Sequence, residues 1–369
     1  MKKNKYKKIH VAVLFGGKSA EHEVSIRSAQ SIYNALDKKK YDITLIGIDK
    51  NGVWIPFNTE KLLSSKRILL DEQKNTTITA IAPYGTNGQF LAKKSSGGVE
   101  KVDVVFPVLH GPFGEDGTIQ GLLKLANVPF VGAGVLGSAV GMDKDVAKRL
   151  LRDAGLPTAN FHIYSEFEKK NISFEKVKKD LGLPLFVKPA NLGSSVGITK
   201  VHDKAEFIKA VNSAFCYDNK ILIEEYIKGK EIECSVLGND KPIASVCGEI
   251  IPNHEFYSYE AKYLDDNGAV LSIPAKISKP IMSKIQVLAV KVFKVLCCEG
   301  MARVDFFLTE DEKIYINEIN TIPGFTSISM YPKLWEESGI PYGKLIDTLI
   351  KLAIDRHNKE QKLKTSFIK

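Results

Sequence analysis

Four polar side chains near the C-terminal end of the sequence have the types and spacing of a site for phosphoryl transfer. Arg303 and Asp305 are two residues apart in one apolar stretch, and Glu318 and Asn320 are two apart in the next. Alternate residues of a strand face one side, so on a β-hairpin these side chains can converge. Carboxylate and amide oxygens suit Mg²⁺ shared with phosphate, and an arginine beside them suits charge stabilisation. An ordinary exposed hairpin with scattered charges fits the same spacing.

A lysine followed by a serine-rich loop forms a second candidate site. Lys188 lies inside the apolar strand 185–189, where a charge needs a partner, commonly an anion. The loop 191–197, Asn-Leu-Gly-Ser-Ser-Val-Gly, offers backbone N–H groups and hydroxyls that can cover phosphates. A carboxylate such as Glu231, after the strand 220–226, suits a ribose. A plain β-turn between two strands is the alternative for the loop.

Two glycine loops lie nearer the N-terminus. Gly17-Lys18-Ser19 resembles the end of a P-loop, but that motif needs a glycine five residues before Gly17, where the sequence has Ala12. The second loop follows a buried strand at 102–109 and begins with His110. Ligands of open α/β sheets sit at such strand ends, although a lone histidine at a strand end more often has a structural role.

The elements that must position these residues are mixed α/β. A strand at 9–15, a helix at 24–36 and a strand at 41–48 predict a βαβ unit and a parallel sheet. The glycine-rich stretch 132–141 predicts a domain boundary, and the long aromatic loop 252–275 predicts a functional lid. Further elements are predicted as helices at 118–126, 143–154, 203–214, 280–296 and 343–355, and as strands at 231–237, 242–250, 303–308 and 313–319.

Composition limits the functional classes. The chain has 369 residues, 44% hydrophobic, and a formal charge of +9. Residues 1–8 and 356–369 account for this excess, so the body is balanced and we expect solvated basic ends and no nucleic-acid partner. No apolar run approaches a membrane span, and the N-terminus lacks a cleavage site, which favours a cytoplasmic protein. Five Cys without a C-x-x-C pattern predict free thiols.

Seven segments, in order, resemble the ATP-grasp ligases, specifically the D-alanine–D-alanine ligases. They cover nearly the whole chain, and no matched position departs from the family motif. The segments are LFGGKSAEHEVS at 14–25, HGPFGEDGTIQG at 110–121, GMDKDVAKRLL at 141–151, FVKPANLGSSVG at 186–197, YEAKY at 259–263, RVDFF at 303–307 and NEINTIPGFTSIS at 317–329.

The resemblance implies an ATP-grasp fold, with an N-terminal parallel α/β domain (1–140) and two α+β domains (141–229 and 230–369) that enclose ATP. It also implies roles for residues that spacing alone does not define. For ATP these are Lys144, Lys188, Ser194, Ser195, Glu224 and Glu231; for two Mg²⁺ (or Mn²⁺) Asp305, Glu318 and Asn320; for the first D-alanine Glu21, Ser194 and Tyr263; for the oxyanion Arg303 and the amide of Gly324; for the second D-alanine Lys262 and Ser329, with His110 lining the site.

The implied reaction has two steps. One D-alanine carboxylate attacks the γ-phosphate of ATP, and the amine of a second D-alanine then attacks the resulting acyl phosphate. Tyr263 is a neutral phenol at pH 7, which favours an arriving ammonium over D-lactate. We therefore expect D-alanyl-D-alanine for peptidoglycan synthesis, from a homodimer. The alternatives are a D-alanine–D-lactate or other ATP-grasp ligase, and a nucleotide-binding regulatory protein without turnover.

Overall fold

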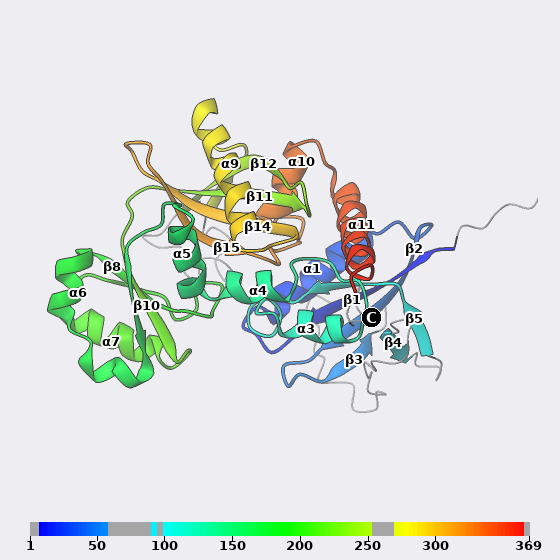
Figure 1. The fold of residues 1–369 in the computed structure, drawn as a ribbon, viewed down its shortest axis with the longest axis horizontal. Helices are drawn as coiled ribbons and strands as arrows, with labels where there is room; N and C mark the ends of the chain where they lie inside the picture. The colour runs from blue at the N-terminus through cyan, green and yellow to red at the C-terminus, as the bar shows by residue number, and fades with distance from the viewer. Residues whose placement is uncertain (1–6, 58–89, 94–98, 253–268, 365–369) are drawn as a thin grey trace, which may run out of the picture.

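The part of the protein that the structure describes is built from three main sheets, each covered by helices. The computed structural model describes residues 7–57, 90–93, 99–252 and 269–364. In Figure 1 the N-terminal sheet lies at the lower right, the central sheet at the left and the C-terminal sheet at the upper centre. This arrangement brings segments that are far apart in sequence to one central region. The domain boundaries at 140 and 229 remain a prediction.

The N-terminal sheet confirms the predicted βαβ opening. Strand β1 (Ile9–Gly16) pairs in parallel with β2 (Tyr41–Ile48) and with β6 (Val104–Val108), and the order is β3-β2-β1-β6. The centre of β1 is fully buried because both faces are covered, as expected of a parallel strand. The remaining elements here are α1 (His22–Ala35), β3 (Trp54–Phe57), α3 (Thr118–Leu125) and the separate ribbon of β4 (Phe90–Lys93) and β5 (Val99–Val102).

The last helix returns to the N-terminal sheet. Helix α11 (Tyr342–Glu360) buries Leu345, Ile346 and Leu349 in one apolar core with β1 and β6. Its end corrects the expectation of a wholly solvated basic tail, because Arg356 is buried and donates hydrogen bonds to the carbonyls of Phe130 and Gly132 at 2.8 and 2.6 Å. The C-terminal end of the described chain therefore closes the N-terminal core.

The glycine-rich stretch 132–141 contains a helix that the sequence did not suggest. Helix α4 (Val135–Met142) packs against the C-terminal region so closely that a Cβ on Gly137 would lie 2.5 Å from the Cys297 carbonyl oxygen. At Gly141 the corresponding distance to Thr321 Cγ2 is 3.0 Å. The close packing compensates for the low helix propensity of glycine here, because a residue with a Cβ would not fit at these positions.

Asp143 ends α4 and caps the next helix, as predicted. Its carboxylate accepts a hydrogen bond from the Val146 amide at 3.0 Å at the start of α5 (Lys144–Asp153). The central sheet follows, in the order β7-β10-β8-β9. Its elements are β7 (Phe161–Ser165), the 3₁₀ helix η2 (Glu166–Asn171), α6 (Phe174–Leu181), β8 (Leu185–Pro189), β9 (Thr199–Val201), α7 (Lys204–Ala214) and β10 (Lys220–Glu225).

The C-terminal sheet has the order β13-β12-β11-β14-β15 and is antiparallel throughout. The predicted helix 280–296 is α9 (Lys279–Val295), whose apolar stripe is buried against this sheet. The remaining elements are β11 (Lys230–Gly238), β12 (Ile243–Pro252), β13 (Ala269–Ser272), β14 (Gly300–Leu308), β15 (Ile314–Asn320) and α10 (Met330–Glu337).

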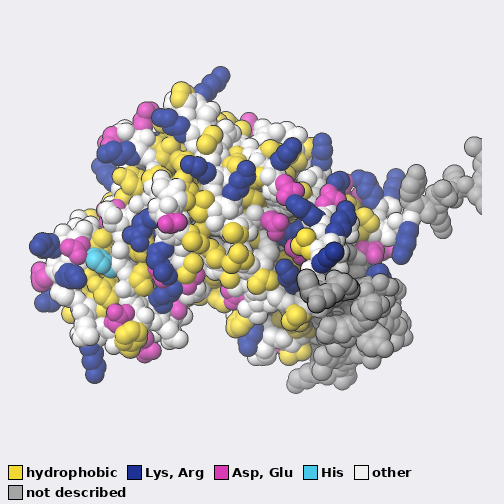
Figure 2. Space-filling view, viewed as in Figure 1, with side chains coloured by type: hydrophobic (Ala, Val, Ile, Leu, Met, Phe, Trp, Pro, Cys, Tyr) yellow, Lys and Arg dark blue, Asp and Glu magenta, His cyan; other side chains and the backbone are white. Residues whose placement is uncertain are grey.

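The surface charges and the cysteines of the described residues are as the composition predicted. Figure 2 shows Lys and Arg interspersed with Asp and Glu across the viewed face. All five cysteines are free. Among the described residues, no helix combines the length and apolar character needed to cross a bilayer.

Candidate active site

A cavity of about 320 Å³ lies between the central and C-terminal sheets. Polar groups from both sheets line it, and they include most of the residues predicted to bind ATP. These are Lys144, Lys188, Ser194, Ser195, Glu224 and Glu231, and the predicted metal ligand Glu318 also lines the cavity. Apolar side chains that the sequence reading did not single out complete the walls, and a flat base could pack against them: Phe186, Ile198, Tyr226, Ile227, Ile250, Ile251 and Phe307.

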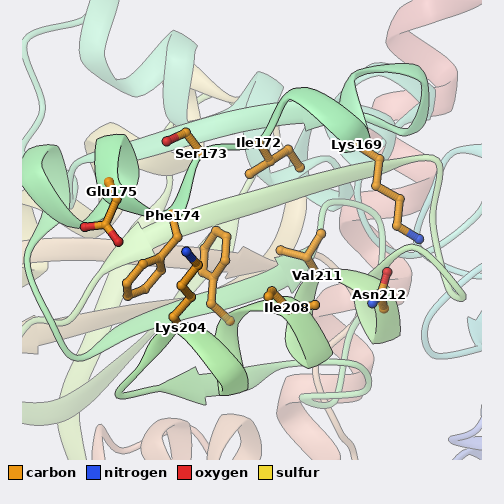
Figure 3. Close-up of a pocket in the computed structure, with 10 residues that line it drawn as sticks. Lys169, Ile172, Ser173, Phe174, Glu175, Lys204, Ile208, Val211 and Asn212 are labelled. Carbon is orange, nitrogen blue, oxygen red and sulfur yellow. The ribbon is translucent and has the colours of Figure 1, made fainter.

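A second hollow of the same volume lies between α6 and α7 in the central region (Figure 3). Phe174 and Phe207 form part of its wall, with ring centroids 5.2 Å apart, and Lys169 and Lys204 also line it. None of the predicted site residues that the structure describes lines this hollow. Volume alone therefore does not identify the active site, whereas the chemistry of the lining does.

The C-terminal hairpin brings its predicted side chains together. In the β14–β15 register Asp305 lies opposite Glu318 and Arg303 lies opposite Asn320. Arg303 donates to Asp305 through two nitrogens at 2.8 Å each, and Asn320 Nδ2 donates to Asp305 Oδ2 at 2.9 Å. Arg303, Asp305 and Asn320 therefore form one hydrogen-bonded network with Glu318 opposite Asp305, an arrangement that a hairpin of scattered charges would not give.

A bulge in β15 adds a residue to the cavity lining that simple strand alternation would have turned away from the cavity. The register shifts between Asp305 and Phe306, so that Asn317 is the extra residue on β15. Neighbouring strand residues normally face opposite sides, yet Asn317 and Glu318 both line the cavity. The bulge explains this, since such irregularities redirect side chains beside functional sites.

Arg303 has a further partner on the adjacent strand. Glu233 of β11 lies opposite Asp305, is buried, and places Oε2 2.9 Å from Arg303 Nε. Burial opposes the charge on Arg303, but Asp305 and Glu233 raise its pKa above the ordinary value. The sequence reading missed Glu233, although its position opposite the hairpin on a neighbouring strand is the signal that could have found it.

Lys144 joins the two sides of the cavity. Its Nζ donates to the Leu192 carbonyl at 2.6 Å and lies 3.3 Å from Glu318 Oε2. The helix N-terminus, the serine loop and the hairpin therefore meet at one ammonium group. This position fits the predicted contact with phosphate.

Lys188 has a buried anionic partner, as predicted for a lysine inside an apolar strand. Lys188 Nζ donates to Glu224 Oε2 at 2.5 Å, and Lys148 forms an ion pair with Glu224 Oε1. Burial raises the pKa of Glu224, but the two lysines outweigh it and hold the pKa at about 2. Lys148 was not among the predicted site residues, because its sequence position fits an ordinary amphipathic helix.

The serine loop has an unusual backbone. Ser194 and Ser195 have φ values of 52° and 58°, in the left-handed region that costs energy for residues with a Cβ. A Cβ on the preceding Gly193 would lie 3.4 Å from Glu21 Oε2. The fold therefore brings Glu21 and the Ser194 loop side by side, as the predicted contact to the first D-alanine requires.

His110 and Glu115 hold the backbone of Ile322 from the N-terminal domain. His110 Nδ1 donates to the Ile322 carbonyl at 3.0 Å, and Glu115 Oε1 accepts from the Ile322 amide at 3.0 Å. Burial lowers the pKa of His110, and burial followed by the charge of Glu21 raises the pKa of Glu115 to about 8. The sequence reading missed Glu115, although it lies in the same glycine loop as His110.

The loop after β15 places Gly324 beside Ser329. A Cβ on Gly324 would lie 2.9 Å from Ser329 Oγ, and Ser329 Oγ accepts from the Thr326 amide at 3.0 Å. The other predicted substrate contacts, Lys262 and Tyr263, lie outside the described residues, as does most of the expected lid at 252–275.

The hairpin oxygens fit a hard divalent cation. Among the described residues no group of three or more His, Cys, Asp or Glu is placed to hold a metal ion. The trio of Asp305, Glu318 and Asn320 instead combines two carboxylates with an amide. Such oxygen donors suit Mg²⁺, which takes few protein ligands and completes its shell with water and phosphate.

Comparison with known proteins gives the same assignment. A family model described as "D-ala D-ala ligase N-terminus" matches residues 10–133, and one described as "D-ala D-ala ligase C-terminus" matches residues 150–351. The D-alanine–D-alanine ligase of Oceanobacillus iheyensis is 54% identical over 358 residues, which cover 96% of this chain and 98% of that protein. D-alanine–D-alanine ligase A of Escherichia coli K12 is 50% identical over 362 residues, covering 98% and 100%.

Solved structures agree with the sequence relatives. The D-alanine–D-alanine ligase of Coxiella burnetii matches with a TM-score of 0.86 and 43% identity, covering 96% of each chain. The VanG D-Ala:D-Ser ligase of Enterococcus faecalis matches with a TM-score of 0.84 and 38% identity, covering 94% of this chain and 100% of that one. With family models and relatives matching along nearly its whole length, this chain belongs to the D-alanine–D-alanine ligase family and has the family's ATP-grasp fold.

Proposed function

We propose that the protein joins two D-alanines to D-alanyl-D-alanine, with ATP as the energy source, for peptidoglycan precursor synthesis. The supporting observation is the opposition of charges across one cavity, where Lys144 Nζ lies 3.3 Å from Glu318 Oε2. Lysines on one wall suit the phosphates, and the hairpin oxygens on the other suit cations. Such a pairing serves phosphoryl transfer, in which catalysis rests on positioning and charge stabilisation.

In the first step a carboxylate oxygen of one D-alanine attacks the γ-phosphorus of ATP. A new C–O–P linkage forms, the bond to the β-phosphate oxygen breaks, and ADP leaves. Lys144 and Lys188 would hold the phosphates and reduce their repulsion of the incoming carboxylate. Glu21 and Ser194, which the fold brings side by side, would position that D-alanine.

In the second step the amine of another D-alanine, having lost its ammonium proton, attacks the acyl carbon. The C–N bond forms and inorganic phosphate departs. Arg303 and the Gly324 amide would stabilise the oxygen that becomes negative during this step. Ser329, adjacent to Gly324, would contact the second substrate together with Lys262.

We also propose that Asp305, Glu318 and Asn320 hold two Mg²⁺, which Mn²⁺ can replace. When bound, such ions would neutralise phosphate oxygens. A homodimer in the cytoplasm completes the proposal. Helices α3 and α4, which pack together, expose Leu122, Leu125 and Leu136, and a second copy of the chain would cover these side chains if they lie in the dimer interface.

The test is an assay of ADP and phosphate release with ATP, Mg²⁺ and a panel of D-alanine, L-alanine, D-serine and D-lactate. We expect release with D-alanine, D-alanyl-D-alanine as the main product by mass, and little D-alanyl-D-lactate at neutral pH. A main product containing D-serine or D-lactate would move the assignment to another ligase of this fold. ATP binding without ADP release would favour the regulatory protein.

A further inference from the structure

We propose that Lys148 is a positioning residue that engages Glu224 and so prevents Glu224 from fully neutralising Lys188 on the phosphate-binding wall. Lys148, Glu224 and Lys188 form the central charge cluster, in which one carboxylate bridges two ammonium groups. Lys188 lines the cavity, whereas Lys148 does not. This inference rests on the proposed binding of ATP in that cavity and extends it to a residue behind the wall.

Lys148 is buried, and its charge has few groups to act on. Its side chain is 2% exposed, and so is that of Glu224. It lies one helical turn after Lys144 on α5, so both point from the same face of the helix. The ring of Phe161 lies 5.9 Å from its Nζ. Burial lowers the pKa of Lys148, and the charge of Glu224 opposes this shift, so the buried ammonium group depends on its place in the cluster.

The charges of the cluster define that role. Glu224 alone would neutralise Lys188, and the wall would then offer ATP a neutral pair. With Lys148 present, two lysines share one glutamate, and an excess positive charge remains on the side that faces the cavity. In a site shielded from water this charge acts strongly on phosphate. Lys148 also occupies Glu224 Oε1, so that Oε2 remains for Lys188.

A double-mutant cycle tests the charge balance. K148M, E224Q and the double variant are compared with wild type by ADP release, and KM is measured for ATP and for D-alanine. We expect K148M to raise the KM for ATP roughly tenfold and to leave the KM for D-alanine unchanged. With Glu224 made neutral by E224Q, Lys188 is no longer cancelled, so K148M should then change the KM for ATP less than about twofold.

Two controls separate the possible failures. K209M removes an exposed lysine of α7 in the same region and should leave both KM values unchanged. Equal effects of K148M in the wild-type and E224Q backgrounds would overturn the charge role, as would an unchanged KM for ATP. If K148M does not fold, a tenfold difference between E224Q and the double variant overturns it instead. If the wild-type protein released no ADP, that result would contradict the proposed function rather than the role of Lys148.

Discussion

The two walls of the cavity carry opposite charge. On the central wall two lysines share Glu224. Glu318 lines the opposite wall. It belongs to the hairpin cluster, defined as Arg303, Asp305, Glu233, Glu318 and Asn320, whose other members lie behind that wall and in which one arginine faces three carboxylates. The first wall has an excess of positive charge and the second an excess of negative charge. We therefore expect phosphates to balance the charge of the first wall and cations to balance that of the second.

Removal of Glu318 should produce the largest effect, because it lies where the walls meet. We expect Glu318→Ala to retain less than about a tenth of wild-type turnover at saturating Mg²⁺. The melting temperature should change little, since the side chain is 29% exposed at the cavity. Glu318→Gln is the matched variant of the same shape. Turnover above a tenth in Glu318→Ala would show that the negative wall does not need this carboxylate.

Replacement of Arg303 tests the positive group inside the negative wall. Arg303→Lys keeps the charge but loses the two-nitrogen contact with Asp305. We expect kcat to fall roughly 10²-fold, as for loss of an oxyanion donor, while the KM for ATP stays near the wild-type value. Steady-state kinetics separate the two constants. A raised KM with an unchanged kcat would assign Arg303 to ATP binding instead.

Two glutamates, Glu224 and Glu115, should have opposite effects on stability as pH changes. The pKa of Glu224 is about 2, so its stabilisation is present above its ordinary pKa near 4.5 and is lost as the pH falls from there toward 2. The pKa of Glu115 is about 8, so its ionisation destabilises the fold as the pH rises from about 4.5 to 8. Each contribution should reach at most a few kcal/mol.

Urea unfolding of Glu224→Gln and Glu115→Gln against wild type, at about pH 3, 6 and 8.5, measures both contributions. The free-energy difference between wild type and Glu224→Gln should shrink in acid. Wild type should lose stability relative to Glu115→Gln in alkali. If the two free-energy differences changed with pH in the same direction, the lysines beside Glu224 would not lower its pKa as proposed.

The smallest expected effect is at Ser329, outside both charged clusters. Ser329→Ala removes a hydroxyl beside Gly324, and we expect a few-fold rise in the KM for D-alanine with kcat nearly unchanged, as for loss of one hydrogen bond. Ser327→Ala, two residues away and exposed, is the control. Identical kinetics for the two variants would remove Ser329 from the substrate site.

The sequence predicted the regular elements well, because apolar periodicity and capping are local. The strand 41–48, the strand 185–189 and the Asp143 cap all lie where they were expected. Hairpin alternation also predicted the convergence of Asp305 with Glu318. Recognition of the remaining site residues depended on family resemblance, since they come from segments that are far apart in the sequence and belong to separate sheets.

Other features depend on contacts between distant segments, which local pattern does not encode. The bulge at Asn317 changes which side chains face the cavity. Helix α4 forms despite its glycines because of close packing. Lys148 and Glu115 looked like an ordinary helix residue and an ordinary loop residue until the fold placed partners against them.

The most direct test of the opposed walls is a titration with Mn²⁺ in the presence of ADP, followed by the EPR signal of free Mn²⁺, with ADP alone as the baseline. Mn²⁺ accepts the same oxygen ligands as Mg²⁺. We predict two Mn²⁺ per wild-type chain and at most one in Glu318→Gln, whereas Lys209→Met should match wild type. Equal Mn²⁺ stoichiometry in wild type and Glu318→Gln would contradict the assignment of the hairpin as the cation-binding wall.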